Sequence, residues 1–230
     1  MPDNYERFVT SYLRLNGYFT VPGFVVHAGD DRKRISREQV GNYTEVDVLA
    51  VRMPNSLELA PMEITNHELL LDGAGPTAGL IDVVIAEVKS GNDSKPNPVW
   101  CKGTLYPIEY LVRFVGLHAA DEIGCVAKAL ASEYCYEDKR CRIRYIVIAQ
   151  QPNKYYQAKG VTYLVLRDAI EFIVKARGSS WIGAGLGVAS CHHQWDDMLI
   201  SLFKIANKNG LTDEAKIDEI ETYLAKPSGH

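Results

Sequence analysis

The chain lacks an excess of basic charge and a long apolar run, and each absence excludes a class of protein. The formal net charge is −4, so no overall basic footprint indicates a purely electrostatic nucleic-acid binder. An enzyme with a local basic groove remains compatible with this balance. No apolar run approaches the roughly 20 residues that a transmembrane helix requires, and we therefore expect no membrane partner.

Features of secreted proteins are also scarce. The chain has five cysteines, an odd number without dense spacing, which favours reduced thiols over a disulfide framework. The first residues, Met1 to Glu6, have neither the basic start nor the apolar core of a signal peptide. Both observations predict a cytoplasmic location.

Two common cofactor motifs are missing. Cys135 and Cys141, and the run Cys191-His192-His193, lack the paired spacing of zinc motifs, so buried thiols and surface histidines are the favoured interpretation. The segment 183–187 is rich in glycine but does not follow the G-x-G-x-x-G pattern, and there is no Walker A lysine. The sequence therefore does not indicate a nucleotide-binding loop.

What the chain does contain is ordinary globular composition with alternating helical and extended patterns. Hydrophobic residues make up 47% of its 230 residues and charged residues 23%. Periodicity predicts helices over 5–15, 104–117, 121–134, 169–176, 193–207 and 212–224, and strands over 18–27, 43–52, 81–89, 142–149 and 161–166. This order indicates an α/β fold, with a central mixed β-sheet flanked by helices. We expect an α/β core over 1–177 with an insertion at about 53–80, and a Gly/Ser-rich loop with a C-terminal helical extension over 178–230.

Charged residues interrupt two of the most apolar strands. Glu87 and Lys89 end the strand 81–89 and, with a side-chain period of two, point to the same face. Such charges are costly on a buried strand unless they pair, bind a metal or meet water. Asp47 is embedded among valines of the strand 43–52. Glu6 lies in the first turn of the first helix, where complementing the helix dipole is the simpler explanation.

These residues suit a metal site if the two strands are neighbours. The carboxylates of Asp47 and Glu87, with the Val88 carbonyl between them, offer the hard oxygen ligands that Mg²⁺ or Mn²⁺ accepts. Such a metal activates water and neutralises charge on a phosphoryl oxygen. Lys89 would orient that water and contact the scissile phosphate, and Glu6 would bond to metal-bound water or help hold a second ion. The alternative is a structural Glu87–Lys89 ion pair with Asp47 nearby.

The arrangement Glu6…Asp47…Glu87-Val88-Lys89, on helix, strand and strand, resembles the PD-(D/E)xK, or restriction-endonuclease-like, nucleases. This superfamily includes Holliday-junction resolvases and Mrr-type enzymes, and the resemblance covers roughly residues 1–150. It implies a Mg²⁺-dependent endonuclease that hydrolyses DNA phosphodiester bonds, with Asp47 and Glu87 as metal ligands and Lys89 as the catalytic lysine. Because many such enzymes act as dimers, a homodimer is also an expectation.

Two other functional classes stay open at this point. One alternative is a catalytically inactive nuclease-fold module that binds DNA, and the other is a module that binds another protein. Lys102 and Gln150 are candidates for lining the same cleft and contacting nucleic acid. Asp82, at the start of the strand 81–89, is interpreted as a capping or turn residue. Trp100, like the tyrosines that follow it, is interpreted as core rather than as a base-stacking residue.

Overall fold

A computed structural model describes residues 3–27, 42–54, 56, 67, 70, 79–91, 93–101, 105–178 and 197–226. Lys102, the glycine-rich segment 183–187 and the run 191–193 lie outside these described residues. The helices are α1 (Asn4–Leu15), α2 (Pro98–Cys101), α3 (Leu105–Val115), α4 (Ile123–Glu133), α5 (Lys154–Gln157), α6 (Leu166–Phe172), which continues as the π-helical segment η2 (Ile173–Gly178), α9 (Asp197–Ala206) and α10 (Asp213–Leu224). The strands are β1 (Phe19–His27), β2 (Asn42–Arg52), β3 (Ile81–Lys89), β4 (Cys135–Glu137), β5 (Cys141–Ala149) and β6 (Thr162–Val165).

Each strand and each long helix expected from periodicity is present, with bounds that differ by a few residues. The elements that the sequence did not predict are α2, α5 and β4. Each has only three or four residues, which is too short for a hydrophobic period to show.

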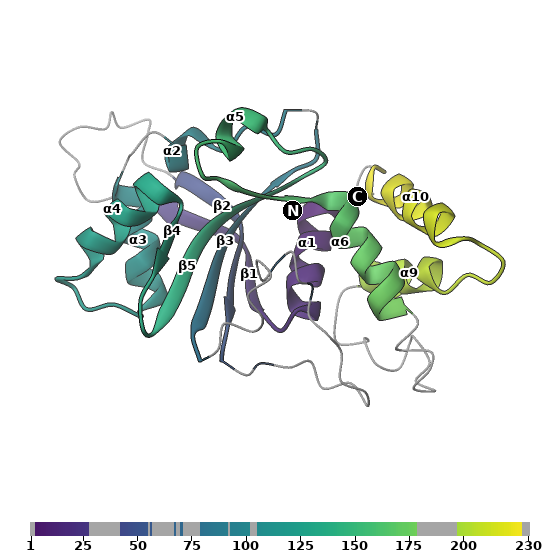
Figure 1. The fold of residues 1–230 in the computed structure, drawn as a ribbon, viewed down its shortest axis with the longest axis horizontal. Helices are drawn as coiled ribbons and strands as arrows, with labels where there is room; N and C mark the ends of the chain where they lie inside the picture. Colours follow the sequence, from purple (N-terminus) through teal and green to yellow (C-terminus); the bar gives the residue numbers. More distant parts are fainter. Residues whose placement is uncertain are drawn as a thin grey trace.

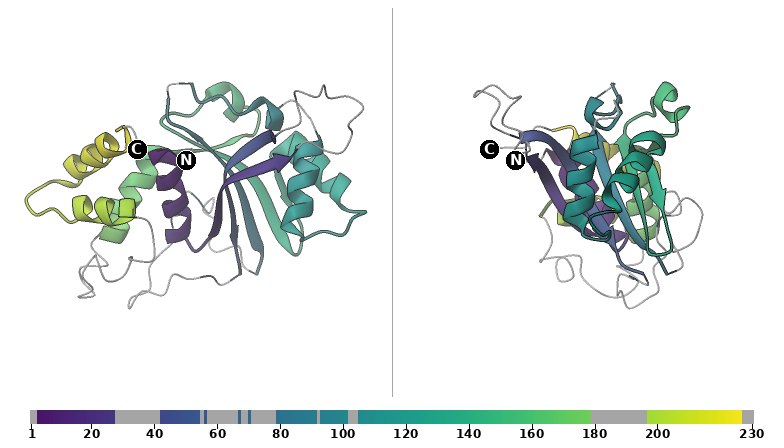
Figure 2. Two further views of the ribbon diagram at one scale, coloured as in Figure 1. Left: turned by 180° about the vertical axis from the view of Figure 1, so that it is seen from behind. Right: turned by 90° about the vertical axis from the view of Figure 1, so that its left-hand side faces the viewer.

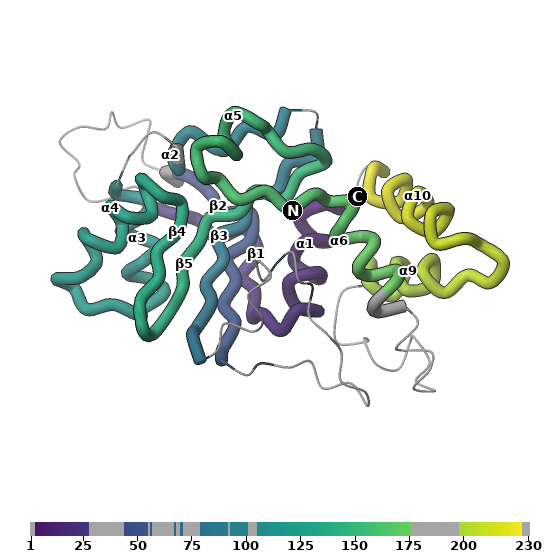
Figure 3. The backbone as a smooth tube through the Cα atoms, viewed as in Figure 1, coloured from purple at the N-terminus to yellow at the C-terminus, as the bar shows by residue number. Residues whose placement is uncertain are grey.

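The strands form a six-stranded mixed sheet in the order β1-β2-β3-β5-β4, with β6 also paired to β5. Strands β1, β2 and β3 form an antiparallel meander, whereas β3 and β5 are parallel. Parallel neighbours need a crossover connection, and the tube in Figure 3 shows the chain passing through α3 and α4 before it returns as β5. Strand β3 is therefore central, as its nearly continuous apolar run predicts.

Helices cover both faces of the sheet (Figures 1 and 2). On one face α1 and α6 pack on the sheet in a core that includes Val84 and Ile146, and α9 and α10 pack on α1, α6 and η2. On the other face α3 and α4 pack against Val83, Ile85 and Val147. Successive strand residues thus supply two separate cores, because their side chains alternate between faces. The expectation of an α/β fold with a mixed sheet flanked by helices is confirmed.

Helix α1 begins and ends where its sequence indicates. Asp3 is the N-cap, and its side chain accepts a hydrogen bond from the Glu6 N–H while Glu6 accepts one from the Asp3 N–H. This reciprocal pair is a capping box. The helix ends at Asn16, and Gly17 follows with φ of +83°, a conformation that favours glycine.

The C-terminal helices belong to the same apolar core as α1 and α6. Leu202 and Phe203 of α9 and Ile220 of α10 are fully or almost fully buried within it. Within the described residues, the predicted extension therefore packs on α1, α6 and η2 and shares their core. Two residues of the predicted insertion are anchored there as well: Leu70 is buried in this core, and His67 bonds to the Tyr12 hydroxyl at 2.6 Å.

Asp82 differs from its expected role. It is fully buried, and it contacts Arg142, Arg144 and the Tyr18 hydroxyl. Although burial by itself raises the pKa of the Asp82 carboxyl, Arg144 and these partners hold it below its usual value. The interpretation of Asp82 as a turn or capping residue is therefore wrong, because its partners come from strands and loops that are distant in the sequence.

In the part of the chain that the structure describes, no helix has the length and apolar character needed to cross a bilayer.

Candidate active site

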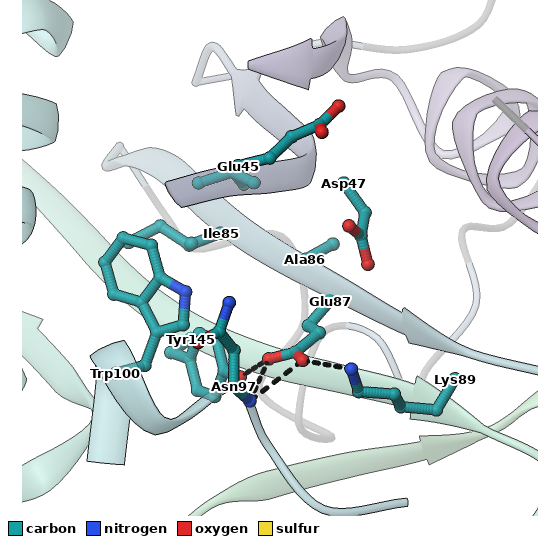
Figure 4. Close-up of a pocket in the computed structure, with 10 residues that line it drawn as sticks. Glu45, Asp47, Ile85, Ala86, Glu87, Lys89, Asn97, Trp100 and Tyr145 are labelled. Carbon is teal, nitrogen blue, oxygen red and sulfur yellow. Dashed lines mark hydrogen bonds and ion pairs between the residues drawn. The ribbon is translucent and has the colours of Figure 1, made fainter. Parts of the chain in front are cut away.

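The site lies where β2 separates from β3. The two strands pair from Arg52 and Asp82 to Val48 and Ala86, where their pairing stops. Strand β2 continues beside β1 as far as Asn42, while β3 continues beside β5 through Lys89. The divergence leaves a cavity of about 130 Å³. Its lining comprises Glu45, Val46, Asp47, Ile85, Ala86, Glu87, Lys89, Asn97, Trp100 and Tyr145 (Figure 4).

Asp47 holds the two strands together at the point of separation. Its Oδ2 accepts a hydrogen bond of 2.7 Å from the Val88 N–H. A side chain thus supplies the acceptor for an N–H two residues beyond Ala86, the last residue of β3 that pairs with β2. Figure 4 shows the Asp47 carboxylate pointing toward Glu87 and Lys89, whereas that of Glu45 points away. The structure therefore brings Asp47, Glu87 and Lys89 together, as the sequence predicted for neighbouring strands.

Glu87 is the most constrained of these residues. Its carboxylate pairs with Lys89 Nζ at 2.6 Å, accepts the Asn97 N–H at 2.8 Å on each oxygen, and accepts the Tyr145 hydroxyl. The Glu87 side chain is 8% exposed and that of Lys89 is 30% exposed, so the ammonium lies nearer the solvent. The ion pair expected under the structural alternative is therefore present, inside the same cavity as Asp47.

The cavity contains more carboxylates than positive charge to balance them. Burial raises the pKa of Asp47, although the Val88 N–H and Lys89 favour its charged form. Burial also raises the pKa of Glu87 despite its contacts with Lys89 and the Asn97 N–H. Each carboxylate would be more easily ionised beside an added cation. The donor set, made of hard carboxylate oxygens, fits Mg²⁺ or Mn²⁺.

Glu6 has a structural role and an electrostatic one. Its carboxylate completes the capping box of α1 and does not line the cavity. Burial, followed by repulsion from Asp47 and Asp3, raises the pKa of Glu6 to about 7. The role of Glu6 at the start of α1 thus accounts for its position. The effect of Asp47 on the pKa of Glu6 indicates that the two carboxylates are close enough to repel each other.

Gln150 lies in a different place from the candidate metal ligands. It lines a second, larger cavity of about 510 Å³ that also includes Tyr5 of α1 and Arg167 of α6. Arg167 is itself paired with Glu214, among other acids. Gln150 therefore does not line the same cavity as Asp47 and Glu87, and the structure does not describe Lys102.

Sequence reasoning missed the groups that hold Glu87. Tyr145 lies in the middle of β5, opposite Ile85 of β3, and its ring stacks on Trp100 with centroids 5.8 Å apart. Asn97 precedes α2, and its side chain also bonds to Thr44 of β2 at 3.1 Å. No motif in the sequence indicates these contacts, because they depend on the register of β5 against β3 and on the turn after Gly91.

Comparison of the chain with protein-family models finds no match, and comparisons with curated proteins and with solved structures find none either.

Proposed function

We propose that this chain is a metal-dependent nuclease of the restriction-endonuclease-like type that hydrolyses DNA phosphodiester bonds. The observation that carries the proposal is the convergence of Asp47, Glu87 and Lys89 on one cavity at the divergence of β2 from β3. The element order α1-β1-β2-β3, a crossover through α3 and α4, and then β5 beside β3 also supports it. Glu6, Asp47 and Glu87 lie on α1, β2 and β3, which agrees with the helix, strand and strand of the resemblance.

The carboxylates of Asp47 and Glu87 are the residues that would hold the metal. A bound Mg²⁺ would supply an activated water and neutralise charge on the phosphate. Asp47 is positioned by the Val88 N–H, and Glu87 by Tyr145 and the Asn97 N–H. These bonds fix the orientation of both carboxylates, which would preorganise them as metal ligands.

Lys89 would stabilise the charge that builds on the phosphate during hydrolysis. Its ammonium is the more exposed member of the pair with Glu87, so it can reach a phosphate oxygen without leaving the cavity. With a cation on the carboxylates, Glu87 would no longer depend on Lys89 for its counter-charge. Glu6, with a pKa of about 7, can accept or release a proton near Asp47 at neutral pH.

The test is cleavage of plasmid, linear, single-stranded and branched DNA with Mg²⁺ or Mn²⁺, compared with EDTA. Wild type is assayed beside Lys89→Ala and a matched control, Lys128→Ala, on the exposed surface of α4. We expect metal-dependent cleavage in wild type and control, and a loss on the order of 10²–10³-fold in Lys89→Ala, the size measured for removal of one charge-stabilising donor.

The contact between Glu87 and Lys89 makes an inactive DNA-binding module the second candidate, since the pair satisfies both charges without a metal. That function predicts a DNA mobility shift at low salt, where phosphate contacts are strongest, that Lys89→Ala leaves intact. Binding without cleavage on any of the four substrates would favour this module and contradict the nuclease. The predicted homodimer is checked in the same preparations by light scattering.

A further inference from the structure

A second cluster of metal-binding side chains lies at the far end of the sheet. His118 comes from the turn between α3 and α4, Asp138 from the turn between β4 and β5, and Cys141 is the first residue of β5. One donor atom from each lies within 4.8 Å of the others. Cys141 begins β5, and Val147 of the same strand pairs with Glu87, so about 20 Å of extended chain separates the cluster from the candidate metal ligand Glu87.

We propose that His118, Asp138 and Cys141 form a binding site for Zn²⁺ or a similar transition-metal ion. This site is independent of the proposed nuclease centre.

The spacing of the sulfur and nitrogen donors agrees with tetrahedral coordination. Metal–sulfur and metal–nitrogen bonds of ordinary zinc length place a ligand sulfur and nitrogen about 3.5 Å apart across a tetrahedral angle. Cys141 Sγ and His118 Nε2 are 3.4 Å apart. Mixed nitrogen, sulfur and oxygen donors suit Zn²⁺, whereas Mg²⁺ and Ca²⁺ prefer oxygen alone.

The three ligands are held in place by other contacts. Asp138 Oδ1 accepts the backbone N–H groups of Arg140 at 2.7 Å and Cys141 at 2.9 Å, while Oδ2 accepts Arg140 Nε at 3.2 Å, Arg140 Nη2 at 3.1 Å and the Tyr136 hydroxyl at 3.4 Å. The His118 side chain is 0% exposed and that of Asp138 is 22% exposed. An ion would therefore enter from the Asp138 side, where water can complete the fourth position.

The neighbouring side chains of Glu122 and Arg140 complete the charge balance around the proposed ion. Glu122 Oε2 lies 3.7 Å from His118 Nδ1, and Arg140 Nη2 contacts both Glu122 and Asp138 at 3.1 Å. A Cys141 thiolate, Asp138 and Glu122 carry three negative charges, which a divalent ion and Arg140 together neutralise.

Binding requires two proton movements. In the described structure Arg140 Nη2 lies 3.1 Å from His118 Nδ1, which makes Nδ1 the acceptor and Nε2 the protonated nitrogen. Coordination through Nε2 would move that proton to Nδ1. Arg140 Nη2, which donates to Nδ1 in the structure, would then turn away so that the Glu122 carboxylate can approach and accept the Nδ1–H, as carboxylates do for many zinc-bound histidines. The Cys141 thiol, whose pKa burial and Asp138 raise to about 11, releases its proton to the solvent.

The experiment titrates Co²⁺, followed by Zn²⁺, into the full chain after removal of metals and with a phosphine reductant. We expect one equivalent of Co²⁺ to produce a near-ultraviolet thiolate-to-cobalt band with visible absorption of tetrahedral intensity, and Zn²⁺ to abolish both. Cys141→Ser should lose the near-ultraviolet band, whereas Cys125→Ser, which removes an exposed thiol of α4, should retain it. Asp47→Asn should also retain it, because that change affects only the other site.

Asp138→Asn provides a second variant in case Cys141→Ser does not fold. An asparagine Oδ1 still accepts the two N–H groups of the turn, so the fold is expected to persist while metal affinity falls by more than about tenfold. Absence of a near-ultraviolet band in wild type would overturn the proposal, as would a band that survives Cys141→Ser. Unchanged affinity in Asp138→Asn would equally overturn the three-ligand site.

Discussion

The contact between Asp47 and the Val88 N–H allows metal binding to be separated from folding. Two substitutions are compared: Asp47→Asn retains an oxygen that can accept this N–H, whereas Asp47→Ala removes the acceptor. Both remove the carboxylate that would bind Mg²⁺. Asp47→Asn also removes a negative charge that burial makes costly, as the raised pKa of Asp47 indicates.

The expected magnitudes follow from these contacts. Loss of the acceptor for a partly buried N–H costs about 1–3 kcal/mol, which for a chain of this length lowers the melting temperature by about 2–12 °C in Asp47→Ala. Asp47→Asn should melt at or above the temperature of metal-free wild type. Mg²⁺ at a hundred times its dissociation constant stabilises wild type by about 2.7 kcal/mol, or about 5–11 °C. Neither variant should show that rise.

The assay is thermal unfolding followed by circular dichroism, with and without millimolar Mg²⁺ or Mn²⁺, in all three proteins. The reasoning would be refuted by a wild type that neither metal stabilises, or by a rise in Asp47→Asn equal to that of wild type. An Asp47→Asn variant that melts as low as Asp47→Ala would show that the carboxylate's charge, rather than an acceptor oxygen, holds β2 to β3.

Two further predictions concern charge and pH. Folding raises the pKa of Glu6 from 4.5 to about 7 and also raises the pKa values of Asp47 and Glu87. The folded, metal-free protein therefore binds more protons than the unfolded chain, and its free energy of unfolding falls as the pH rises through this range. Since metal competes with those protons, the rise in melting temperature on adding Mg²⁺ should be larger near pH 8 than near pH 5.5, and equal rises would contradict the site. Asp82→Asn should lower the free energy of unfolding in urea by about 3–5 kcal/mol, because two buried arginines lose their carboxylate partner. The exposed control Asp93→Asn should change it little, and equal losses in the two variants would argue against the buried network.

The sequence was sufficient to predict the main elements because each carries its own local signal. Helix α1 has an apolar stripe, the acidic N-cap Asp3 and the terminating Asn16-Gly17. Strands β3 and β5 are mostly apolar segments of the length of a buried strand, each interrupted by two or three charged residues. Such patterns need no knowledge of distant residues.

The candidate ligands were predictable for a related reason. Asp47, Glu87 and Lys89 stand out because a charge on an apolar strand has to be compensated. The sequence could not supply the compensation itself, since the contacts of Glu87 with Tyr145 and Asn97 arise only when β5 and the turn before α2 are placed against β3. The interpretation of Asp82 was wrong for the same reason, because the sequence does not show which residues become its partners.

The sequence by itself therefore determined where helices and strands form and which strand residues carry a charge that needs a partner. Tertiary structure alone decided which partners those are. It placed Asp47 in the opening between β2 and β3, buried Asp82 among arginines of β5, and brought His118 to Cys141. The physical reason is that hydrophobic periodicity is a local property of the chain, whereas strand register and the compensation of buried charge depend on residues that meet only after the chain has folded.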